Sequence, residues 1–277
     1  MNRLYSLQQK DWALTVLAGV LVGTVGLGMT TLKWQSDTWI ILVLSAFAAG
    51  STWTVLFLYR RLQNEIRIEA NHIEAAVALY GVISPRLPLP AFGGTAIEAD
   101  TARELVSLVL QRHPRRVVEC GSGLSTLLVG YALEKLREGQ ILSMEHLANW
   151  SEMTRTRIEQ HGLKRHAVVF HAPLEAIEIL GMRRWKWYAP NCWVDWKQID
   201  LLIIDGPPAW EDESARYPAL PLLWNYLSDG AVIFLDDTGR PGEKAVIAEW
   251  LALYPGKLSR TDVETSKGLT LLTVSKR

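Results

Sequence analysis

The sequence predicts an α/β domain built on a doubly wound, mostly parallel sheet, preceded by a two-helix transmembrane hairpin. Three observations predict this arrangement. Two long stretches near the N-terminus carry no charged residue, short apolar runs alternate with helical patterns after Asp100, and two β-rich runs close the chain around Ser266-Lys267-Gly268. Repeated strand–helix units form a parallel sheet with helices on both faces, and the closing runs supply a C-terminal antiparallel hairpin.

The two charge-free stretches are residues 12–32 and 38–59. Each is long enough to cross the hydrocarbon core of a bilayer, which needs about 20 apolar residues. A signal peptide is the alternative for the first stretch, and a buried core hairpin is the alternative for both. The second stretch follows at once, which disfavours a signal peptide, and the lack of a polar face disfavours a soluble core. We therefore expect two membrane spans.

The charges that flank the hairpin predict its orientation. Arg3 and Lys10 precede the first span, and Arg60, Arg61 and Arg67 follow the second, whereas the short connection holds a single lysine. Basic residues near the ends of spans stay on the cytoplasmic side. Both termini and the α/β domain are therefore expected in the cytoplasm, on a multi-pass membrane protein.

The chain divides into three predicted parts. Residues 1–61 hold the hairpin, residues 62–86 form a juxtamembrane helix and linker, and residues 87–277 form the α/β domain. In the first span, Gly19 and Gly23 form a pattern that lets helices approach closely, so a homo-oligomer through the spans is one expectation. The apolar residues expected to share one face of the juxtamembrane helix are Ile66, Ile73, Val77 and Tyr80.

Composition excludes several other classes of protein. Lys and Arg total 29 and Asp and Glu total 29, so no excess of basic residues exists to hold nucleic acid. The two cysteines, Cys120 and Cys192, are far apart and have no metal-ligand spacing. A disulfide framework and a zinc knuckle are therefore not expected.

The elements of the domain follow from periodicity and turn residues. Helices are expected over residues 100–111, 127–136, 151–160, 217–227 and 244–253, with Asp100 as the N-cap of the first. Strands are expected over residues 116–119, 141–144, 167–170, 201–204, 231–235, 258–263 and 269–274. Aromatic residues gather between the third and fourth strands: Trp185, Trp187, Tyr188, Trp193 and Trp196. They could lie on lipid headgroups or stack on a substrate, but packing within the domain is favoured.

A glycine-rich segment, Glu119-Cys120-Gly121-Ser122-Gly123, follows the first strand of the domain. Glycine lets the backbone turn sharply and approach a ligand closely. Glu145 ends the second strand, about 20 residues further on, where a carboxylate can bind ribose hydroxyls. A solvated strand end is the alternative for Glu145 alone, but the glycines and the βαβ arrangement favour a nucleotide-type ligand.

This segment resembles the glycine-rich motif of class I, Rossmann-like S-adenosylmethionine-dependent methyltransferases. The resemblance extends to Glu145 and to Asp205 in Ile203-Ile204-Asp205-Gly206-Pro207-Pro208, and it covers the chain from about Pro90 to the C-terminus. Thr126 stands where a dinucleotide-binding G-x-G-x-x-G pattern would have its third glycine. A nicotinamide-dependent oxidoreductase is therefore the less favoured alternative.

The resemblance implies how the cofactor is bound. Glu119 would face the methionine amino group, the glycines would border the methionine and ribose parts, and Glu145 would hold the ribose. The adenine would lie near His146 and the loop that contains Pro173. The cofactor-binding residues implied in this way are Glu119, Gly121, Ser122, Gly123, Ser125, Glu145, His146, Pro173 and Asp205.

Three carboxylates are expected at neighbouring strand ends: Asp205 after the fourth strand, and Asp236 and Asp237 after the fifth. They would repel one another unless a cation or protons intervened, and oxygen ligands suit Mg²⁺. This layout resembles metal-dependent O-methyltransferases of the catechol type, as does the stretch Ala215-Arg216-Tyr217-Pro218. The alternative is that Asp236-Asp237 only caps the turn before Gly239.

The catechol-type enzymes carry a lysine base shortly after the first metal-binding aspartate. Here the segment from Gly206 to Asp212 contains no lysine or histidine, so Asp205 and Asp212 are the predicted catalytic residues. The alternative is a metal-bound hydroxyl that needs no strong base. The predicted function is methyl transfer from S-adenosylmethionine to a hydroxyl of a small-molecule or lipid-linked acceptor at a membrane. A membrane-tethered S-adenosylmethionine-binding protein without catalytic activity is the alternative.

Overall fold

The computed structural model describes residues 37–179, 181 and 184–276. The chain forms two compact units, residues 1–68 and residues 69–277, and each is described by itself. The predicted first span, residues 12–32, lies outside the described residues.

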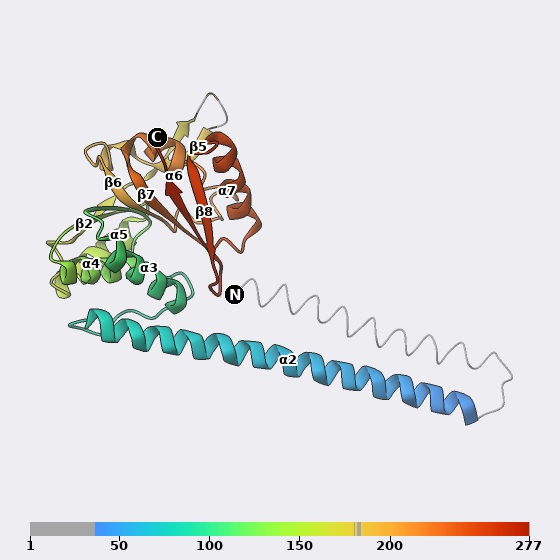
Figure 1. Cartoon of the computed structure of the whole chain (residues 1–277). Coiled ribbons are helices and arrows are strands. Elements are labelled where there is room, and N and C mark those ends of the chain that lie inside the picture. Colours follow the sequence, from blue (N-terminus) through green and yellow to red (C-terminus); the bar gives the residue numbers. More distant parts are fainter. Residues whose placement is uncertain (1–36, 180, 182–183, 277) are drawn as a thin grey trace. The chain divides into compact units, whose positions relative to one another are not determined.

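Helix α2 runs without interruption from Asp37 to Ile83 and has 47 residues (Figure 1). It joins the predicted second span and the predicted juxtamembrane helix into one element, because no proline separates them. Its apolar side chains before Arg60 are exposed: Phe47 is 64% exposed and Trp53 is 61% exposed. Among the described residues it is the one helix long and apolar enough to cross a membrane, judged by length and composition alone. The described part of the chain thus shows one such helix in place of a two-helix hairpin.

The last turns of α2 belong to the folded domain. Ala75, Leu79 and Ile83 are buried in it, whereas Ile73 and Val77 are 65% and 69% exposed. The residues of the predicted apolar face, which also includes Ile66 and Tyr80, are thus exposed. The domain contacts a neighbouring face of the helix, which carries Ala75, Leu79 and Ile83. The helix ends before Pro85, which disfavours helical backbone in the residue before it.

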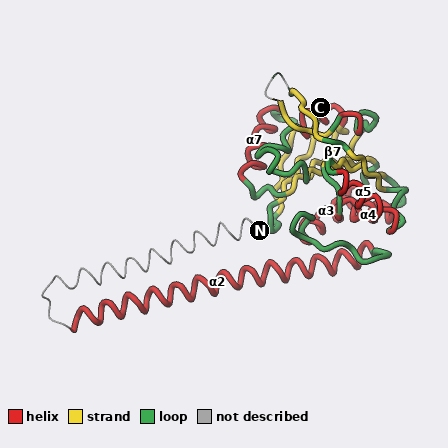
Figure 2. Tube along the Cα trace, turned by 180° about the vertical axis from the view of Figure 1, so that it is seen from behind, coloured by secondary structure: helices red, strands yellow, loops and turns green. Residues whose placement is uncertain are grey.

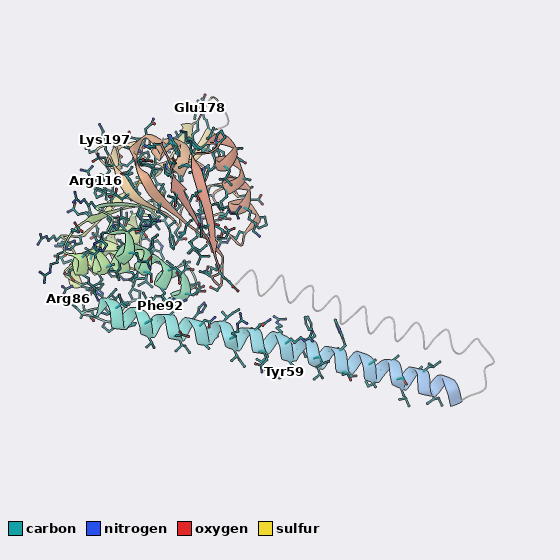
Figure 3. All side chains as sticks on the ribbon, in the orientation of Figure 1. Tyr59, Arg86, Phe92, Arg116, Glu178 and Lys197 are labelled. Atoms are coloured by element: carbon teal, nitrogen blue, oxygen red, sulfur yellow. The ribbon has the colours of Figure 1, made fainter. Side chains whose placement is uncertain are left out.

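The segment after α2 is fastened to the domain by Arg86, labelled in Figure 3. Its backbone N–H donates to the Tyr131 hydroxyl at 2.9 Å, and its guanidinium donates to the His161 carbonyl at 2.8 Å and to Glu134 at 2.6 Å. Phe92 packs against the core from the same segment. These contacts hold residues 84–98 against the domain.

The main sheet has seven strands in the order β3-β2-β1-β6-β7-β9-β8. Strand β9 is antiparallel to both of its neighbours, and the other pairs are parallel. This confirms the predicted mostly parallel sheet with a C-terminal antiparallel hairpin. The strands are β1 (Arg116–Cys120), β2 (Gln140–Glu145), β3 (Ala167–His171), β6 (Ile199–Ile204), β7 (Leu227–Asp236), β8 (Leu258–Val263) and β9 (Leu269–Val274).

Helices cover both faces of this sheet, as Figures 1 and 2 show. One face packs on α3 (Ala99–Arg112), α4 (Leu124–Leu136), α5 (Ala148–Gln160) and the end of α2. The other packs on α6 (Ala219–Leu223) and α7 (Pro241–Leu253). Neighbouring residues of β1 enter opposite cores, Val117 on the first face and Val118 on the second. This alternation follows from the twofold side-chain period of a strand.

The aromatic segment forms a separate antiparallel hairpin, β4 (Leu174–Glu178) and β5 (Arg184–Tyr188), followed by the short helix η1 (Pro190–Cys192). Trp187 and Tyr188 are completely buried, and Trp193 is almost so. Their side chains join the core on the α6–α7 face. Packing, the favoured interpretation of these aromatics, is therefore confirmed.

Two local predictions were wrong. The helix expected over residues 217–227 is cut to α6 and the short helix η2 (Trp224–Tyr226), because Leu227 already pairs with Ile199 at the start of β7. Asp100 does not cap α3, since Glu98 is the N-cap residue. Its carboxylate instead accepts the backbone N–H of Ser266 at 2.6 Å, which joins α3 to the turn between β8 and β9.

Candidate functional site

The ends of β1, β2 and β6 are tied together by backbone hydrogen bonds. The Gly121 N–H donates to the Met144 carbonyl at 2.9 Å, and the Asp205 N–H donates to the Cys120 carbonyl at 3.1 Å. The Ala172 N–H donates to the Glu145 carbonyl at 2.7 Å, which brings the loop containing Pro173 to the same edge. The predicted cofactor-binding residues therefore come from segments that meet at the carboxyl edge of the sheet, where such folds place ligands.

Gly121 and Gly123 have φ angles of 111° and 151°, which other residues rarely adopt. A Cβ at Gly121 would lie 3.7 Å from the Gly206 nitrogen, so space alone does not require glycine there. The requirement comes from the backbone turn. Gly123 is the N-cap residue of α4, and its N–H donates to the Thr126 hydroxyl at 3.1 Å.

Glu119 lies beneath this turn and is completely buried. Its Oε2 accepts hydrogen bonds from the hydroxyls of Thr126 at 2.6 Å and Ser143 at 2.5 Å. Burial raises the pKa of Glu119, although hydrogen bonds from Ser125, Ser143 and Thr126 oppose this shift. Its Oε1 is buried and has no hydrogen-bond partner among the described residues. A buried acceptor of this kind suits a donor group of a ligand.

Glu145 is held at the end of β2. Its Oε2 accepts the Ser122 hydroxyl at 3.1 Å, and its Oε1 accepts the Leu147 N–H at 2.9 Å. The ring of His146 meets the ring of Tyr188 edge to face, with centroids 6.3 Å apart. These contacts fix the carboxylate predicted to bind ribose and set an imidazole beside it.

A cavity of about 210 Å³ opens at this edge. Ser122, Gly123, Ser125 and Asp205 line it, together with residues of the segment 90–97 and, on α5, Trp150 and Arg157. A larger cavity of about 280 Å³, lined by Arg115, Asp200 and Gly230, lies at the opposite end of the strands. None of the predicted site residues lines that larger cavity. The smaller cavity is therefore the candidate active site.

The predicted carboxylates do converge, but a buried arginine lies among them. The Arg216 side chain is 4% exposed, and its Nη2 lies 3.2 Å from both Asp205 Oδ1 and Asp237 Oδ2. Its Nη1 donates to the Asp236 carbonyl at 2.8 Å. The Asp236 carboxylate turns back and accepts the Asp237 N–H at 2.7 Å, as in the alternative of a capped turn.

Burial is the main influence on two of these carboxyl groups. It raises the pKa of Asp205 to about 6, with Arg216 opposing the shift and Asp237 adding to it. It raises the pKa of Asp236 to about 8, with Asp205 and Asp237 adding to the shift and Arg216 opposing it. Asp205 lines the cavity, and with a pKa of about 6 it can exchange a proton near neutral pH.

The predicted Mg²⁺ site does not fit this arrangement. Oxygens of Asp205 and Asp237 face a guanidinium, and the Asp236 carboxylate binds a backbone N–H. Within the part of the chain that the structure describes, no group of three or more His, Cys, Asp or Glu side chains is arranged to hold a metal ion. The structure brings the three aspartates together around Arg216.

The second predicted catalytic residue, Asp212, does not line the cavity. It lies in the loop after β6, where its Oδ1 accepts the Ser214 N–H at 2.8 Å. Several residues of the site were not assigned a role from the sequence, among them Thr126, Tyr188 and Arg216. The Tyr188 hydroxyl is buried without a hydrogen-bond partner among the described residues. A Cβ on Gly206 would lie 2.5 Å from this hydroxyl, so the glycine of the Asp-Gly-Pro turn gives it room.

Comparisons with known proteins agree with this geometry. Residues 118–238 match the family model described as a methyltransferase domain. A methyltransferase from Podospora anserina, bound to S-adenosylhomocysteine, is 13% identical with a TM-score of 0.54, covering 77% of this chain and 96% of that one. A cofactor-bound protein from MTB is 19% identical with a TM-score of 0.50, covering 74% and 90%. These two likenesses concern the fold alone. No curated protein sequence matches.

Residues 118–238 therefore form a methyltransferase domain, in agreement with the resemblance of the glycine-rich segment to class I S-adenosylmethionine-dependent methyltransferases. The matched residues include the glycine-rich turn, Glu145, Asp205 and the Asp236-Asp237 pair. This match argues against the nicotinamide-dependent oxidoreductase considered as an alternative.

Proposed function

We propose that this protein transfers the methyl group of S-adenosylmethionine to a hydroxyl of a small-molecule or lipid-linked acceptor, with Asp205 as the base. The observation that carries the proposal is the position of Asp205. Its side chain lines the cavity beside Gly123 and Ser125, is 28% exposed and has one oxygen held by Arg216. The other oxygen is left for the acceptor.

The residues around the cavity suit the cofactor. The unpaired Oε1 of Glu119 is an acceptor for an amino group, and the fixed carboxylate of Glu145 is an acceptor for ribose hydroxyls. Ser122, Gly123 and Ser125, from the turn above Glu119, line the same cavity as Asp205. When bound, S-adenosylmethionine supplies a methyl group already activated by its sulfonium charge. The chain then has to hold the acceptor oxygen in line with that methyl group.

Asp205 removes the proton of the acceptor. The new O–CH₃ bond forms while the S–CH₃ bond breaks, and the electrons of the broken bond remain on sulfur as the thioether of S-adenosylhomocysteine. The hydroxyl proton passes to the free oxygen of Asp205 and then to water. A carboxyl with a pKa of about 6 is largely ionised at neutral pH and can accept this proton repeatedly.

The proposal includes a membrane location. The exposed apolar part of α2 supports one span, and the uncharged residues 12–32 would add a second, with both termini in the cytoplasm. The domain boundaries follow: a hairpin over residues 1–61, a connector over residues 62–86 and the catalytic domain over residues 87–277. Packing of the spans against a second copy belongs to the same proposal.

The test uses the full-length protein in detergent micelles. Calorimetry with S-adenosylmethionine measures cofactor binding, and lipid extracts incubated with methyl-labelled cofactor reveal the acceptor class. Asp205→Asn is expected to retain cofactor binding and to lose methyl transfer, because the amide cannot accept the proton. The matched control is Asp195→Asn, an exposed aspartate outside the site. Cofactor binding without methyl transfer to any hydroxyl would favour the non-catalytic alternative, and transfer by Asp205→Asn at the wild-type rate would remove Asp205 as the base.

A further inference from the structure

We propose that the Arg216 guanidinium is the resident cation of this active site, in the position that a divalent metal would take, and that it positions Asp205 for the acceptor. The positioning role rests on the proposed function, whereas the replacement of a metal stands on the structure of the site. Arg216 is a positioning residue in this proposal, because it acts on the acceptor through Asp205.

Arg216 contacts all three residues predicted to bind a metal: the carboxylates of Asp205 and Asp237 and the backbone carbonyl of Asp236. Nη2 donates to the Asp205 carbonyl at 2.9 Å and also lies 3.2 Å from Oδ1 of Asp205 and 3.2 Å from Oδ2 of Asp237. Nη1 donates to the carbonyl of Asp236. Nε lies 3.7 Å from Glu243, a further buried carboxylate. One planar cation thus binds the ends of β6 and β7 together.

The same geometry leaves no room for a divalent ion between these carboxylates. Mg²⁺ binds oxygens at about 2.1 Å and needs them to converge on one point. Here the oxygens of Asp205 and Asp237 converge on Nη2 of Arg216. The guanidinium stays protonated in proteins, so it would repel a metal ion placed between these oxygens. Arg240 adds a second cation at the rim, with its Nη1 3.0 Å from Asp237 Oδ2.

The surroundings hold Arg216 in this position. The carbonyl of the next residue, Tyr217, accepts the indole N–H of Trp250 at 2.9 Å. The Tyr217 ring stacks on Trp185 with centroids 4.8 Å apart. Both tryptophans are buried, so the backbone on the C-terminal side of Arg216 is anchored in the core. An anchored guanidinium holds the Asp205 carboxylate by its Oδ1.

Metal binding tests the replacement directly and needs no acceptor. The full-length protein in micelles is dialysed against Mn²⁺, and thermal unfolding is measured in millimolar Mg²⁺ and in EDTA. We expect no saturable Mn²⁺ binding and the same Tm in both solutions. One equivalent of Mn²⁺ bound by the wild type and lost in Asp237→Asn would overturn the proposal, whatever the acceptor is.

Removing the guanidinium gives the opposite expectation. Arg216→Ala exposes the carboxylates to one another, so this variant should bind Mn²⁺ and gain Tm on addition of Mg²⁺. Arg240→Ala, which removes a half-exposed arginine of the same cluster, should do neither. A folded Arg216→Ala variant without Mn²⁺ affinity would show that Arg216 does not occupy a cation site.

Arg216→Lys tests the positioning role and decides the question if Arg216→Ala does not fold. Lysine keeps the charge but cannot reach all of these oxygens at once. We expect cofactor affinity within about threefold of wild type, less than 1 kcal/mol, together with a kcat lowered at least about tenfold. Transfer by the wild type should be unchanged in EDTA. A wild-type kcat in Arg216→Lys, or transfer abolished by EDTA, would overturn the proposal.

Discussion

The two halves of the active-site edge stabilise their carboxylates with different kinds of partner. At the ends of β1 and β2, hydroxyl groups and backbone N–H groups bind Glu119 and Glu145. At the ends of β6 and β7, a buried guanidinium binds Asp205 and Asp237. Neutral donors satisfy an oxygen without cancelling its charge, so the first half still attracts the cationic parts of a cofactor. The arginine cancels charge, so the second half has little left for a metal ion.

This difference predicts that the stability of the second half depends far more on a single side chain, that of Arg216. Replacing Arg216 by Met leaves buried acidic groups without their cation, which costs about 3–5 kcal/mol of unfolding free energy. Arg240→Ala, at the rim of the same cluster and 45% exposed, should cost less than about 1 kcal/mol. Chemical denaturation of the full-length protein in micelles measures both. Equal losses for the two arginines would contradict the contrast between the halves.

The first half should be most sensitive to its backbone turn. Gly121→Val places a β-branched residue at a φ of 111°, and such strain costs about 1–3 kcal/mol. If the turn changes shape to relieve the strain, affinity for S-adenosylmethionine falls about tenfold to a hundredfold. Calorimetry measures the loss. Gly230→Val is the matched control, since Gly230 has a φ of 79° at the opposite end of β7. Loss of binding in both variants would point to general unfolding.

The hydroxyl donors of the first half predict a smaller effect. Thr126→Val keeps the shape of the side chain but removes the hydroxyl that joins Gly123 to Glu119. A hydrogen bond to a charged group contributes about 1.5–3 kcal/mol, part of which Ser143 can still supply. We expect cofactor affinity to fall about tenfold. Thr156→Val, on the exposed face of α5, should leave the affinity unchanged. An unchanged affinity of Thr126→Val for the cofactor would mean that Glu119 does not need the Thr126 hydroxyl in order to bind it.

The same contrast explains which parts of the site the sequence predicts. Glu119, Gly121 and Gly123 lie in one short segment, and Glu145 ends the next strand, so a local pattern indicates the first half. Thr126 was noted only because it replaces the third glycine of the dinucleotide-binding pattern. A hydroxyl three residues after Gly123 could also have been recognised as a capping group for the following helix. The mostly parallel sheet was predicted for the same reason, since each strand and helix is indicated by its own residues.

The second half could be predicted only in part. The sequence placed Asp205, Asp236 and Asp237 together, but the cation among them comes from a loop whose path depends on tertiary packing. Arg216 was noted only as part of a stretch that resembles the catechol-type enzymes. No pattern in the neighbouring sequence indicates that its side chain reaches the three aspartates. The burial of Tyr188 depends in the same way on the β4–β5 hairpin. The sequence also did not indicate which face of α2 the domain contacts, since Ala75, Leu79 and Ile83 are buried while the predicted apolar face is exposed.

The smallest predicted effect is the pH dependence of methyl transfer. Burial raises the pKa of Asp205 to about 6, so the carboxyl is protonated below that pH and cannot accept the acceptor's proton. The rate at saturating cofactor should rise with pH through about 6 and level off above it, with about a twofold difference between pH 6 and pH 7. Arg216→Lys alters the charge pattern around Asp205 and should move the midpoint, whereas Asp195→Asn should not. The measurement is the initial rate of labelled methyl transfer at several pH values, with thermal unfolding checked at each one. A rate independent of pH from 5 to 8 in the wild type would mean that proton removal does not depend on Asp205, and the base would then have to be sought elsewhere along the cavity.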